Sequence, residues 1–521
     1  MVSITVLDGA GCIGGNKILL EDSGNKLLLD FGTNFLQTGL YYEEYLQPKS
    51  CQGIYEHILM GLLPPYRDLY RPDFITKVCE DFGLWDQVDT KEIGEVDGVL
   101  ISHAHVDHLG SLHFLRTDIP IYCSPLTAAI SRALQDTGKG STAAEYCYYT
   151  PREYLQGDCE GLQTPRNAET YTRQYHLTSK PPEEFVSQWH SLPQEKKNFN
   201  STDFKSADSC AGLTLKSYPV DHSVYGATAW AVETSSGWVV YTGDLRTAGH
   251  YGEFTRRFVE EAARLKPVAL IIEGTRVNSE RTATEDQVRE SCLTAVKNHS
   301  GLIVADFGPR NVERLLIFLE VARQTGRNLL ILPKDAYLLE MMRKAAGNDV
   351  LVPPLEDSGI KIYWEYESRR DSWKKSLRES CDNSLFVGPA DVRKNQGDFI
   401  CCFSFWDINE LAYIKPVDDS AYIFSSCEAF NEEMKIDADR LKHWIDRFNL
   451  RLYGKLLESD QDSDPFHVSG HASGPELFEI VEGIRPKKVI PVHTERPCDY
   501  EQPLRDVCEV IIPEKGTPVL L

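Results

Sequence analysis

A short run of metal-binding side-chain types occurs in the first quarter of the chain. His103, His105, Asp107 and His108 stand within six residues, in the order His-Ala-His-Val-Asp-His. Imidazole nitrogens and carboxylate oxygens are the ligands that zinc takes when no thiolate is used. His-x-His on a loop sends two imidazoles to one side, and the Asp-His pair turns toward a second ion. A lone histidine is usually an ordinary core or surface residue, but this density of ligands predicts a dinuclear metal centre for hydrolysis.

Two metal ions roughly 3.5–4 Å apart need a bridging oxygen acid and about six to seven ligands. Later segments of the chain offer the missing ones as His222, Asp244 and His493, each directly after an expected strand. We predict that one metal is held by His103, His105 and His222, the other by Asp107, His108 and His493, and that Asp244 bridges them. We expect two Zn²⁺ ions, with Mn²⁺ as the alternative. The histidines without ligand spacing are interpreted as ordinary: His57, His113, His176, His190, His250, His299 and His443.

These ligands require a rigid scaffold, and short apolar strands precede each of them. Strands are expected at 3–7, 17–21, 26–30, 99–102, 213–220, 228–233, 238–242 and 268–273. The glycines between residues 9 and 15 lack the Gly-Lys-Ser/Thr of a phosphate loop, so a hairpin turn is expected there. Residues 34–92 read as an inserted helical excursion broken by prolines, and 137–210 as a second, polar and irregular one.

From about residue 284 the pattern changes to alternating helices and strands, which indicates a parallel α/β unit. Helices are expected at 285–297, 310–324 and 437–448, and strands at 302–305 and 328–332. The polar stretch 458–464 indicates a linker. A strand at 466–469, a helix at 476–482 and a strand at 488–491 are expected after it. A length of 521 residues is too great for one compact core, so two or three domains are expected.

Composition sets broad limits. The net charge of −23 and the pI near 5.1 make the chain a poor general binder of nucleic acid. The negative net charge is only weak evidence against nucleic-acid binding in a catalytic groove, because metals and a few basic side chains there outweigh the charge of the distant surface. The 14 cysteines include no Cys-x-x-Cys pair, which argues against thiolate zinc sites and a disulfide framework. No secretory signal and no apolar run long enough for a membrane span is visible, so a cytoplasmic protein without membrane contact is expected.

The histidine run, with a later strand-end His222 and Asp244, resembles the metallo-β-lactamase superfamily. Asp30 in Leu-Asp-Phe-Gly matches that superfamily's early aspartate, which supports the ligand loop rather than binding metal. Three further segments resemble the β-CASP nucleases: Glu273 in Ile-Glu-Gly-Thr, His471 in Ser-Gly-His-Ala-Ser and His493 in Pro-Val-His-Thr-Glu. The sequences of the last two segments are similar to the corresponding motifs of ribonuclease J-like RNA-processing exonucleases.

This resemblance implies an α/β fold, the metallo-β-lactamase αββα sandwich with an inserted α/β β-CASP domain. The sandwich would comprise residues 1–280, including the excursions at about 34–92 and 137–210, and a C-terminal return at 456–521. The β-CASP domain would comprise 281–455, and residues 306–314 look like its opening strand-to-helix segment. The excursions are longer than ribonuclease J would lead us to expect. The sequence of residues 425–430 also differs from the one expected late in a β-CASP domain. Oligomeric state, with a homodimer as one option, and substrate length preference therefore stay open.

The resemblance also implies an activity: hydrolysis of RNA phosphodiester bonds by a metal-activated hydroxide, as a 5′-to-3′ exonuclease in RNA processing or decay, with endonuclease activity as a further option. Asp107 would orient the nucleophile, and His471 would donate to the phosphate or to the leaving 3′ oxygen. Glu273 would accept the second N–H of a ligand histidine, a role that orients the ring. Ser469, His471 and Ser473, with His467, would hold a terminal 5′ phosphate. Simple capping of the following helix by Ser473 and Glu476 explains the same turn, and both can hold.

Several functions are compatible with these residues. Single-stranded RNA is the expected partner, because His493 at the third extra motif goes with RNA-cleaving members of the superfamily. The alternatives are a DNA nuclease, a non-catalytic scaffold subunit of an RNA-processing complex, and a hydrolase of small esters or lactams. Silent relatives usually lose ligands, whereas this chain retains all seven. The inserted domain and the Ser-Gly-His-Ala-Ser turn argue against a small ester or lactam.

Overall fold

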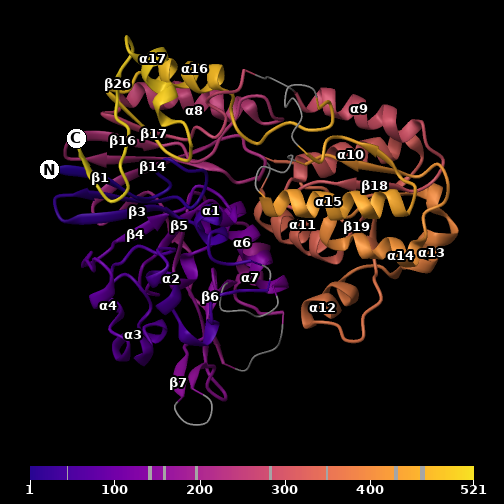
Figure 1. Ribbon diagram of the computed structural model, residues 1–521, viewed down its shortest axis with the longest axis horizontal. Helices are drawn as coiled ribbons and strands as arrows, with labels where there is room; N and C mark the ends of the chain where they lie inside the picture. Colours follow the sequence, from indigo (N-terminus) through magenta and orange to yellow (C-terminus); the bar gives the residue numbers. More distant parts are fainter. Residues whose placement is uncertain are drawn as a thin grey trace.

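The computed structural model describes residues 1–43, 45–138, 144–155, 160–193, 198–280, 284–347, 350–426, 432–457 and 464–521. The chain forms two lobes (Figure 1). The first lobe contains two large sheets that lie face to face, and the second contains one sheet flanked by helices. The predicted linker at 458–464 and the predicted boundary at 280/281 fall largely outside the described residues, so the division into domains stays a prediction.

The first sheet of the first lobe has eight strands in the order β12-β10-β5-β4-β3-β2-β1-β27. Its centre is an antiparallel meander in which the predicted hairpin joins β1 to β2. β4 adds to β3 in parallel and carries the histidine run at its carboxyl end. The bounds are β1 Val2–Asp8, β2 Lys17–Asp22, β3 Asn25–Phe31, β4 Gly98–Leu100, β5 Ile121–Cys123, β10 Tyr175–Leu177, β12 Lys205–Ser206 and β27 Pro518–Leu520.

The second sheet has seven strands in the order β13-β14-β15-β16-β17-β25-β26. β17 and β25 pair in parallel although more than 200 residues separate them in sequence. This pairing returns the C-terminal segment to the first lobe. The bounds are β13 Ser209–Cys210, β14 Leu213–Pro219, β15 Thr228–Thr234, β16 Gly237–Tyr241, β17 Ala269–Ile272, β25 Lys488–Pro491 and β26 Glu509–Val510.

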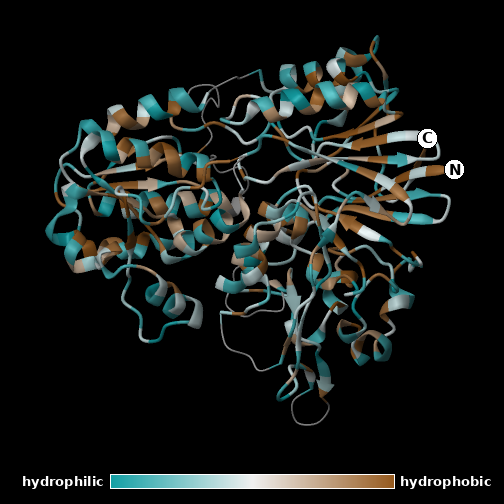
Figure 2. Cartoon of the chain, turned by 180° about the vertical axis from the view of Figure 1, so that it is seen from behind, coloured by the Kyte–Doolittle hydropathy of each residue, from teal (hydrophilic) through white to brown (hydrophobic). Residues whose placement is uncertain are grey.

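The two sheets bury one apolar layer between them, in which Ile4 and Leu29 of the first sheet meet Trp230 and Ile271 of the second. Helices α8 (Gly252–Leu265) and α16 (Gly474–Ile484) cover the outer face of the second sheet. α5 (Val106–Leu109) and α6 (Pro125–Thr137) lie on the side of the first sheet. The strands are predominantly hydrophobic, whereas the outer helices show hydrophilic faces (Figure 2). This is the expected αββα sandwich.

The second lobe has a seven-stranded sheet, entirely parallel, in the order β21-β20-β19-β22-β18-β23-β24. The bounds of its strands are β18 Ile303–Asp306, β19 Asn328–Ile331, β20 Ile360–Tyr363, β21 Phe386–Val387, β22 Phe399–Cys402, β23 Ala421–Phe424 and β24 Arg451–Tyr453. Its main helices are α9 Glu285–Lys297, α10 Val312–Thr325, α11 Pro333–Ala345, α12 Ser372–Ser380 and α15 Glu432–Arg447. The predicted parallel α/β unit is therefore present.

Capping residues set the starts of the first two helices of this lobe. Thr284 and Gln287 form a reciprocal capping box at α9, whose observed bounds equal the prediction. α10 begins at Val312 rather than at the expected residue 310. The Asn311 side chain accepts the backbone N–H of Arg314, so Asn311 is the cap and Arg310 stands outside the helix.

The two excursions of the first lobe pack on one another. The first contains the short helices α1 Phe35–Gly39, α2 Tyr55–Leu59, α3 Lys77–Asp81 and α4 Leu84–Gln87, as the helical prediction required. The second contains the helix α7 Glu183–Trp189 and mostly short strands: β6 Tyr148–Tyr149, β7 Glu153–Leu155, β8 Gly161–Gln163, β9 Thr170–Thr172 and β11 Phe199–Asn200. The buried Arg71 of the first binds Glu145 of the second, with Nη1 2.6 Å from Oε2. This ion pair holds the excursions together.

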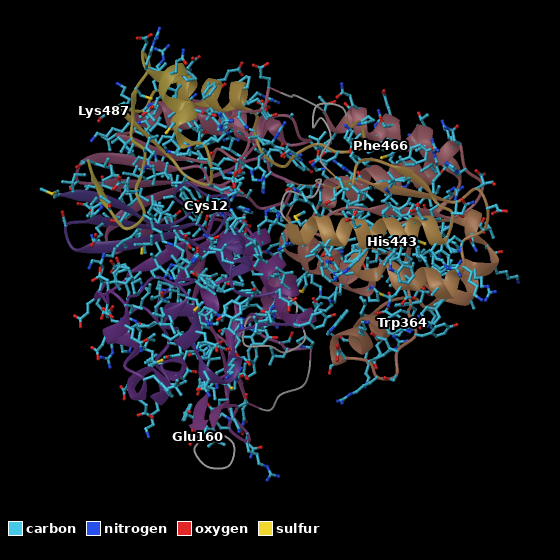
Figure 3. The ribbon with its side chains drawn as sticks, in the orientation of Figure 1. Cys12, Glu160, Trp364, His443, Phe466 and Lys487 are labelled. Atoms are coloured by element: carbon cyan, nitrogen blue, oxygen red, sulfur yellow. The ribbon has the colours of Figure 1, made fainter. Side chains whose placement is uncertain are left out.

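The expected strand at 466–469 is wrong, because this segment is a turn and a loop. Its carbonyl groups bond to side chains rather than to a neighbouring strand. The Phe466 carbonyl accepts from Arg314 Nη1 at 3.1 Å and from Ser425 Oγ at 2.6 Å. The Phe466 ring, labelled in Figure 3, packs against Tyr453 of the second lobe with ring centroids 5.6 Å apart. Contacts with the second lobe therefore replace a sheet ladder.

Among the described residues, no helix combines the length and the apolar character that crossing a membrane would require.

Candidate active site

The histidine run leaves the carboxyl end of β4 as a loop and then forms one helical turn, α5, that begins at Val106. Two backbone bonds pin this turn to the ends of β2 and β3: Gly15 N–H donates to the Asp107 carbonyl and Thr33 N–H to the Val106 carbonyl, both at 3.0 Å. The approach is close enough to require glycine at position 32, where a Cβ atom would lie 1.6 Å from the Asp107 carbonyl oxygen. The run is thus fixed before any ligand binds.

The first predicted ligand group comes together as expected from three loops. His103 Nε2 lies 3.0 Å from His105 Nδ1, and His222 Nε2 lies 3.1 Å from the same His105 atom. Asp244, in the loop after β16, completes this group, in which one ligand atom from each residue lies within 4.8 Å of the others. Its Oδ2 atom is 3.6 Å from His103 Nε2.

The second predicted group, Asp107, His108 and His493, lies directly beside the first. His108 Nε2 is 3.7 Å from Asp107 Oδ2, and His493 Nε2 is 3.8 Å from the same oxygen. Asp244 also reaches this group, with Oδ2 3.1 Å from His108 Nε2 and Oδ1 3.6 Å from His493 Nδ1. Because Asp244 contacts members of both groups, its carboxylate stands where a ligand shared by two metal ions would have to lie.

The hydrogen bonds of these side chains show that bare lone pairs converge. His222 Nδ1 donates to the Gly470 carbonyl at 2.6 Å, so its Nε2 carries the lone pair that faces His105. His108 Nδ1 donates to Asp30, and its Nε2 points at Asp244 Oδ2, 3.1 Å away. Asp244 Oδ1 and His493 Nδ1 are buried and form no hydrogen bond to the described residues. Facing lone pairs and orphaned buried acceptors are unfavourable unless a cation lies among them, so the residues fit a metal cofactor.

Electrostatics favours the ligand-competent protonation state of several of these groups but not of His108, whose pKa the carboxylates of Asp244, Asp107 and Asp30 raise well above its ordinary value against the effect of burial. Burial lowers the pKa of His103 and His105 well below the ordinary value and that of His222 to about 3, which keeps these rings neutral. The pKa of Asp244 lies well below its usual range despite burial, because His108, His493 and His471 surround the carboxylate. Neutral imidazoles and an ionised carboxylate are the forms that bind metal.

Asp30 lies behind the cluster and orients one ligand. Its Oδ2 accepts from His108 Nδ1 at 2.7 Å and from the Tyr241 hydroxyl at 2.6 Å, and its Oδ1 accepts the Ser102 N–H at 2.7 Å. Asp30 and His493 both adopt a left-handed backbone, with φ of 56° and 53°. Such conformations cost free energy in residues other than glycine and persist where the surroundings impose them, commonly at functional sites.

Glu273 and His471 form a pair on the other side of Asp244. His471 Nδ1 lies 2.9 Å from Glu273 Oε2 and 3.9 Å from Asp244 Oδ2. Glu273 is predicted to accept from a ligand histidine, and the histidine that it contacts among the described residues is His471. Burial opposes protonation, but the carboxylates of Glu273 and Asp244 raise the pKa of His471 to about 9. Glu273, Asp244 and His471 also form a third group with metal-ligand spacing.

The turn at 469–473 leads into α16, and its hydroxyls are partly engaged. Ser473 is fully buried, and its hydroxyl and backbone N–H donate to Glu476 at 2.7 and 2.8 Å. Ser469 Oγ accepts the His471 N–H at 3.2 Å. His467 is half-buried and belongs to none of the metal-ligand groups found among the described residues. The capping interpretation of Ser473 is therefore correct, and the phosphate pocket stays a prediction.

Two arginines at the site were given no role by the sequence. Arg246 is fully buried two residues after Asp244 and binds Asp221, Glu285 and Glu313. It also donates from Nη1 to the Ser469 carbonyl at 3.1 Å, so it ties the motif loop to the second lobe. Arg310 reaches the histidine run from that lobe. Their positions after strands β16 and β18 could have indicated a role at the site. The sequence did not reveal that role, because arginine is common on surfaces and the partners of these two arginines lie far away in sequence.

Comparison with known proteins agrees with this arrangement. Residues 82–141, which contain the histidine run, match a β-lactamase superfamily domain. Residues 464–500, which contain His471 and His493, match a Zn-dependent metallo-hydrolase RNA specificity domain. A crystal structure of a protein of unknown function from Enterococcus faecalis V583 superposes over 100% of both chains with a TM-score of 0.65 and 22% identity, which shows the shared fold.

Curated relatives extend over nearly the whole chain. Ribonuclease J of Helicobacter pylori is 20% identical over 95% of this chain, which spans 56% of the length of that relative. Ribonuclease J of Pyrococcus abyssi is 21% identical over 95% of this chain and 90% of its own, and that of Methanocaldococcus jannaschii is 22% identical over 94% and 91%. The αββα sandwich, the converging metal ligands and the parallel sheet of the second lobe agree with these matches, so the chain is similar to the metallo-β-lactamase superfamily and, within it, to β-CASP ribonucleases J.

Proposed function

We propose that this chain is a metal-dependent ribonuclease that hydrolyses phosphodiester bonds of single-stranded RNA, from the 5′ end and with endonuclease action as well. The observation that carries the proposal is the convergence of two ligand groups on the carboxylate of Asp244. The matches to ribonucleases J and to an RNA specificity domain support RNA as the substrate. Action in cytoplasmic RNA processing or decay, and a homodimeric assembly, belong to the same proposal.

The metal ions would be two Zn²⁺, with Mn²⁺ as the alternative. His103, His105 and His222 would hold one of them, Asp107, His108 and His493 the other, and Asp244 would contact both. Ions held there supply Lewis-acid activation of water and neutralise charge on the phosphodiester.

The protein's own groups position the substrate and move the proton. Asp107, whose side chain is 21% exposed, can accept a hydrogen bond from the attacking water. The Glu273 carboxylate holds His471 by Nδ1, which leaves Nε2 to donate to the oxygen that leaves. As the water oxygen bonds to phosphorus, the bond from phosphorus to the 3′ oxygen breaks and that oxygen takes the proton. The remaining RNA then begins with a 5′ phosphate, ready for another round.

The 5′ phosphate pocket is proposed at the turn that precedes α16. Ser469 and His471 would contact the phosphate, with His467 beside them, and Ser473 would hold the turn through its bonds to Glu476. Such a pocket would favour 5′-phosphorylated ends, because the site would gain charge-assisted hydrogen bonds only from that substrate.

The direct test offers the purified protein, stripped of metal and reloaded with Zn²⁺ or Mn²⁺, three end-labelled polymers: 5′-phosphorylated RNA, 5′-hydroxyl RNA and matched DNA. Release of mononucleotides from 5′-phosphorylated RNA is expected. Equal cleavage of DNA would replace the proposal with a DNA nuclease, and cleavage of no polymer by protein that holds its metals would refute both. His105→Ala and Asp107→Ala should abolish cleavage, whereas His443→Ala, at an exposed position of α15, should leave it intact.

A further inference from the structure

Arg310 follows β18 at the carboxyl edge of the parallel sheet in the second lobe. β18 and β23 are neighbours, and the chain leaves β18 toward β19 on one side but leaves β23 toward β24 on the other. In open α/β sheets, ligands bind outside the carboxyl ends of strands whose connections diverge in this way. Arg310 therefore stands where such a sheet offers a ligand site, and this edge faces the first lobe.

The guanidinium of Arg310 lies against the histidine run. Its Nη1 donates to the Ala104 carbonyl, between two metal-ligand residues, at 3.0 Å. Its positive charge acts on His105 and on the Asp107 carboxylate, one member of each predicted ligand group. The side chain is thus within electrostatic reach of both predicted ligand groups.

Arg310 has fewer hydrogen-bond and ion-pair partners among the described residues than Arg246 and Arg314, the other arginines at the lobe interface. Arg246 and Arg314 are enclosed by carboxylates and carbonyl groups. Within the described part of the chain, the guanidinium of Arg310 forms only the bond to Ala104, although it has five N–H donors. An anion beside the metal ligands would complete its bonding.

We propose that Arg310 binds a phosphate of the RNA substrate next to the histidine run, and so links substrate recognition to the second lobe. This inference rests on the proposed function and deepens it. A planar guanidinium with free donors matches a phosphate group in bidentate geometry. The chain carries a net charge of −23, so a polyanion needs such a local cation at the site. Arg310 acts through contact with the substrate, not through the metals.

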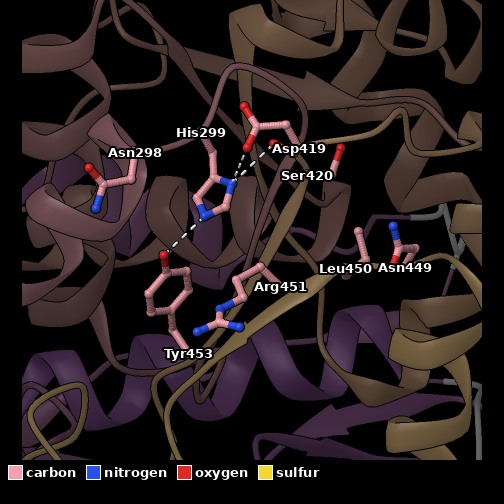
Figure 4. A pocket seen from close by; sticks show the side chains of 8 residues that line it. All are labelled: Asn298, His299, Asp419, Ser420, Asn449, Leu450, Arg451 and Tyr453. Carbon is pink, nitrogen blue, oxygen red and sulfur yellow. Dashed lines mark hydrogen bonds and ion pairs between the residues drawn. The ribbon is translucent and has the colours of Figure 1, made fainter.

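A matched control lies at the opposite end of the same sheet. There the amino ends of β18, β23 and β24 border a hollow of about 460 Å³ that Arg451 lines together with His299 and Asp419 (Figure 4). His299 bonds to Asp419 and to Tyr453. The hollow lies at the amino ends of the strands, whereas the contact with the histidine run lies beyond the carboxyl end of β18. Arg451→Ala removes the same charge from the same lobe without touching the proposed contact.

The test measures binding of a short single-stranded RNA with cleavage-resistant phosphorothioate linkages to metal-loaded protein, by fluorescence anisotropy at several salt concentrations. Arg310→Ala should weaken binding about 10- to 100-fold. It should also lower the slope of log affinity against log salt by about 0.7, the value for one phosphate contact on a single strand. Arg310→Lys should recover part of the affinity, and Arg451→Ala should match the wild type.

Metal content and melting temperature, measured on the same samples, separate binding from architecture. Unchanged metal content in Arg310→Ala, together with the lower slope, supports the proposal. Wild-type affinity in Arg310→Ala overturns it, as does a loss of metal that Arg310→Lys fails to restore, because Arg310 would then only support the Ala104 loop. If the wild-type protein bound no RNA, the proposed function itself would be refuted. If the wild type bound RNA and Arg310→Ala bound it equally well, only the role of Arg310 would be refuted.

Discussion

His108 Nδ1 lies 2.7 Å from Asp30 Oδ2, across 78 residues of sequence. The same carboxylate holds the Ser102 N–H and the Tyr241 hydroxyl, so one buried acid joins β3, the β4 loop and β16 behind the metal ligands. The geometry of the cluster therefore depends on a residue that would not bind metal itself.

Asp30→Asn should weaken metal binding about 10- to 100-fold, because an amide nitrogen would face donors that now share a carboxylate. Competition with a chromophoric chelator measures the affinity. Asp97→Asn is the control, since Asp97 is a carboxylate of the same lobe whose Oδ2 accepts the Lys26 N–H at 2.8 Å. Equal affinities in Asp30→Asn and the wild type would contradict this role.

Metal removal should lower the melting temperature, because the lone pairs of His105 and His222 face one another at 3.1 Å without a cation. Differential scanning calorimetry before and after chelation, and after return of Zn²⁺ or Mn²⁺, measures the change. His222→Ala should respond much less to added metal. A wild-type melting temperature indifferent to metal would show that the cluster binds none.

Glu273→Gln should reduce kcat about 100-fold with metal content unchanged, because the amide no longer orients His471 as a proton donor. His471→Ala should cost a similar factor. The double variant should be little worse than either single one, since the two residues act as a unit. Multiplicative losses would show that they act independently.

Arg246→Met should destabilise the fold by about 3–5 kcal/mol, because it leaves the carboxylates of Asp221, Glu285 and Glu313 without their shared cation. Denaturant unfolding measures the loss. Arg257→Ala, which breaks an exposed ion pair with Glu261, should change stability little. A small effect of Arg246→Met would mean that the interface tolerates unpaired acids.

Asp306 should make stability depend on pH. Burial raises its pKa to about 7, and the Asp407 charge adds to the effect, although the Tyr422 hydroxyl donates to Asp306 at 2.6 Å. The folded state therefore keeps the Asp306 carboxyl group protonated at pH values above 3.8, the ordinary pKa of the group. The contribution of this proton to the free energy of unfolding is complete below pH 3.8 and is lost as the pH rises toward about 7.

The check is the difference in unfolding free energy between wild type and Asp306→Asn, followed from acid to neutral pH. The wild type should lose stability relative to the variant as the pH rises. The comparison with Asp306→Asn removes the contributions of Asp335 and Glu313, whose pKa values burial also raises to about 7. A difference that is flat with pH would show that Asp306 is ionised throughout.

Local pattern determined much of the fold in advance. Short apolar runs predicted β1 to β3 and β14 to β17, and the helical spacing from Glu285 to Lys297 predicted α9 with its observed bounds. The side chains of the histidine run could be recognised as ligands because His103 to His108 are close in sequence, and imidazole and carboxylate chemistry does not depend on context.

Only the tertiary structure decided the rest. Phe466–Ser469 has the residue pattern of a strand, but buried side chains of the second lobe take its carbonyl groups, and no local rule contains those partners. The left-handed backbone of Asp30 and His493 is likewise imposed by packing. Arg310 became part of the site because two lobes meet there. Hydrogen bonds and charges couple residues through space, so their effects cannot be read from spacing along the chain.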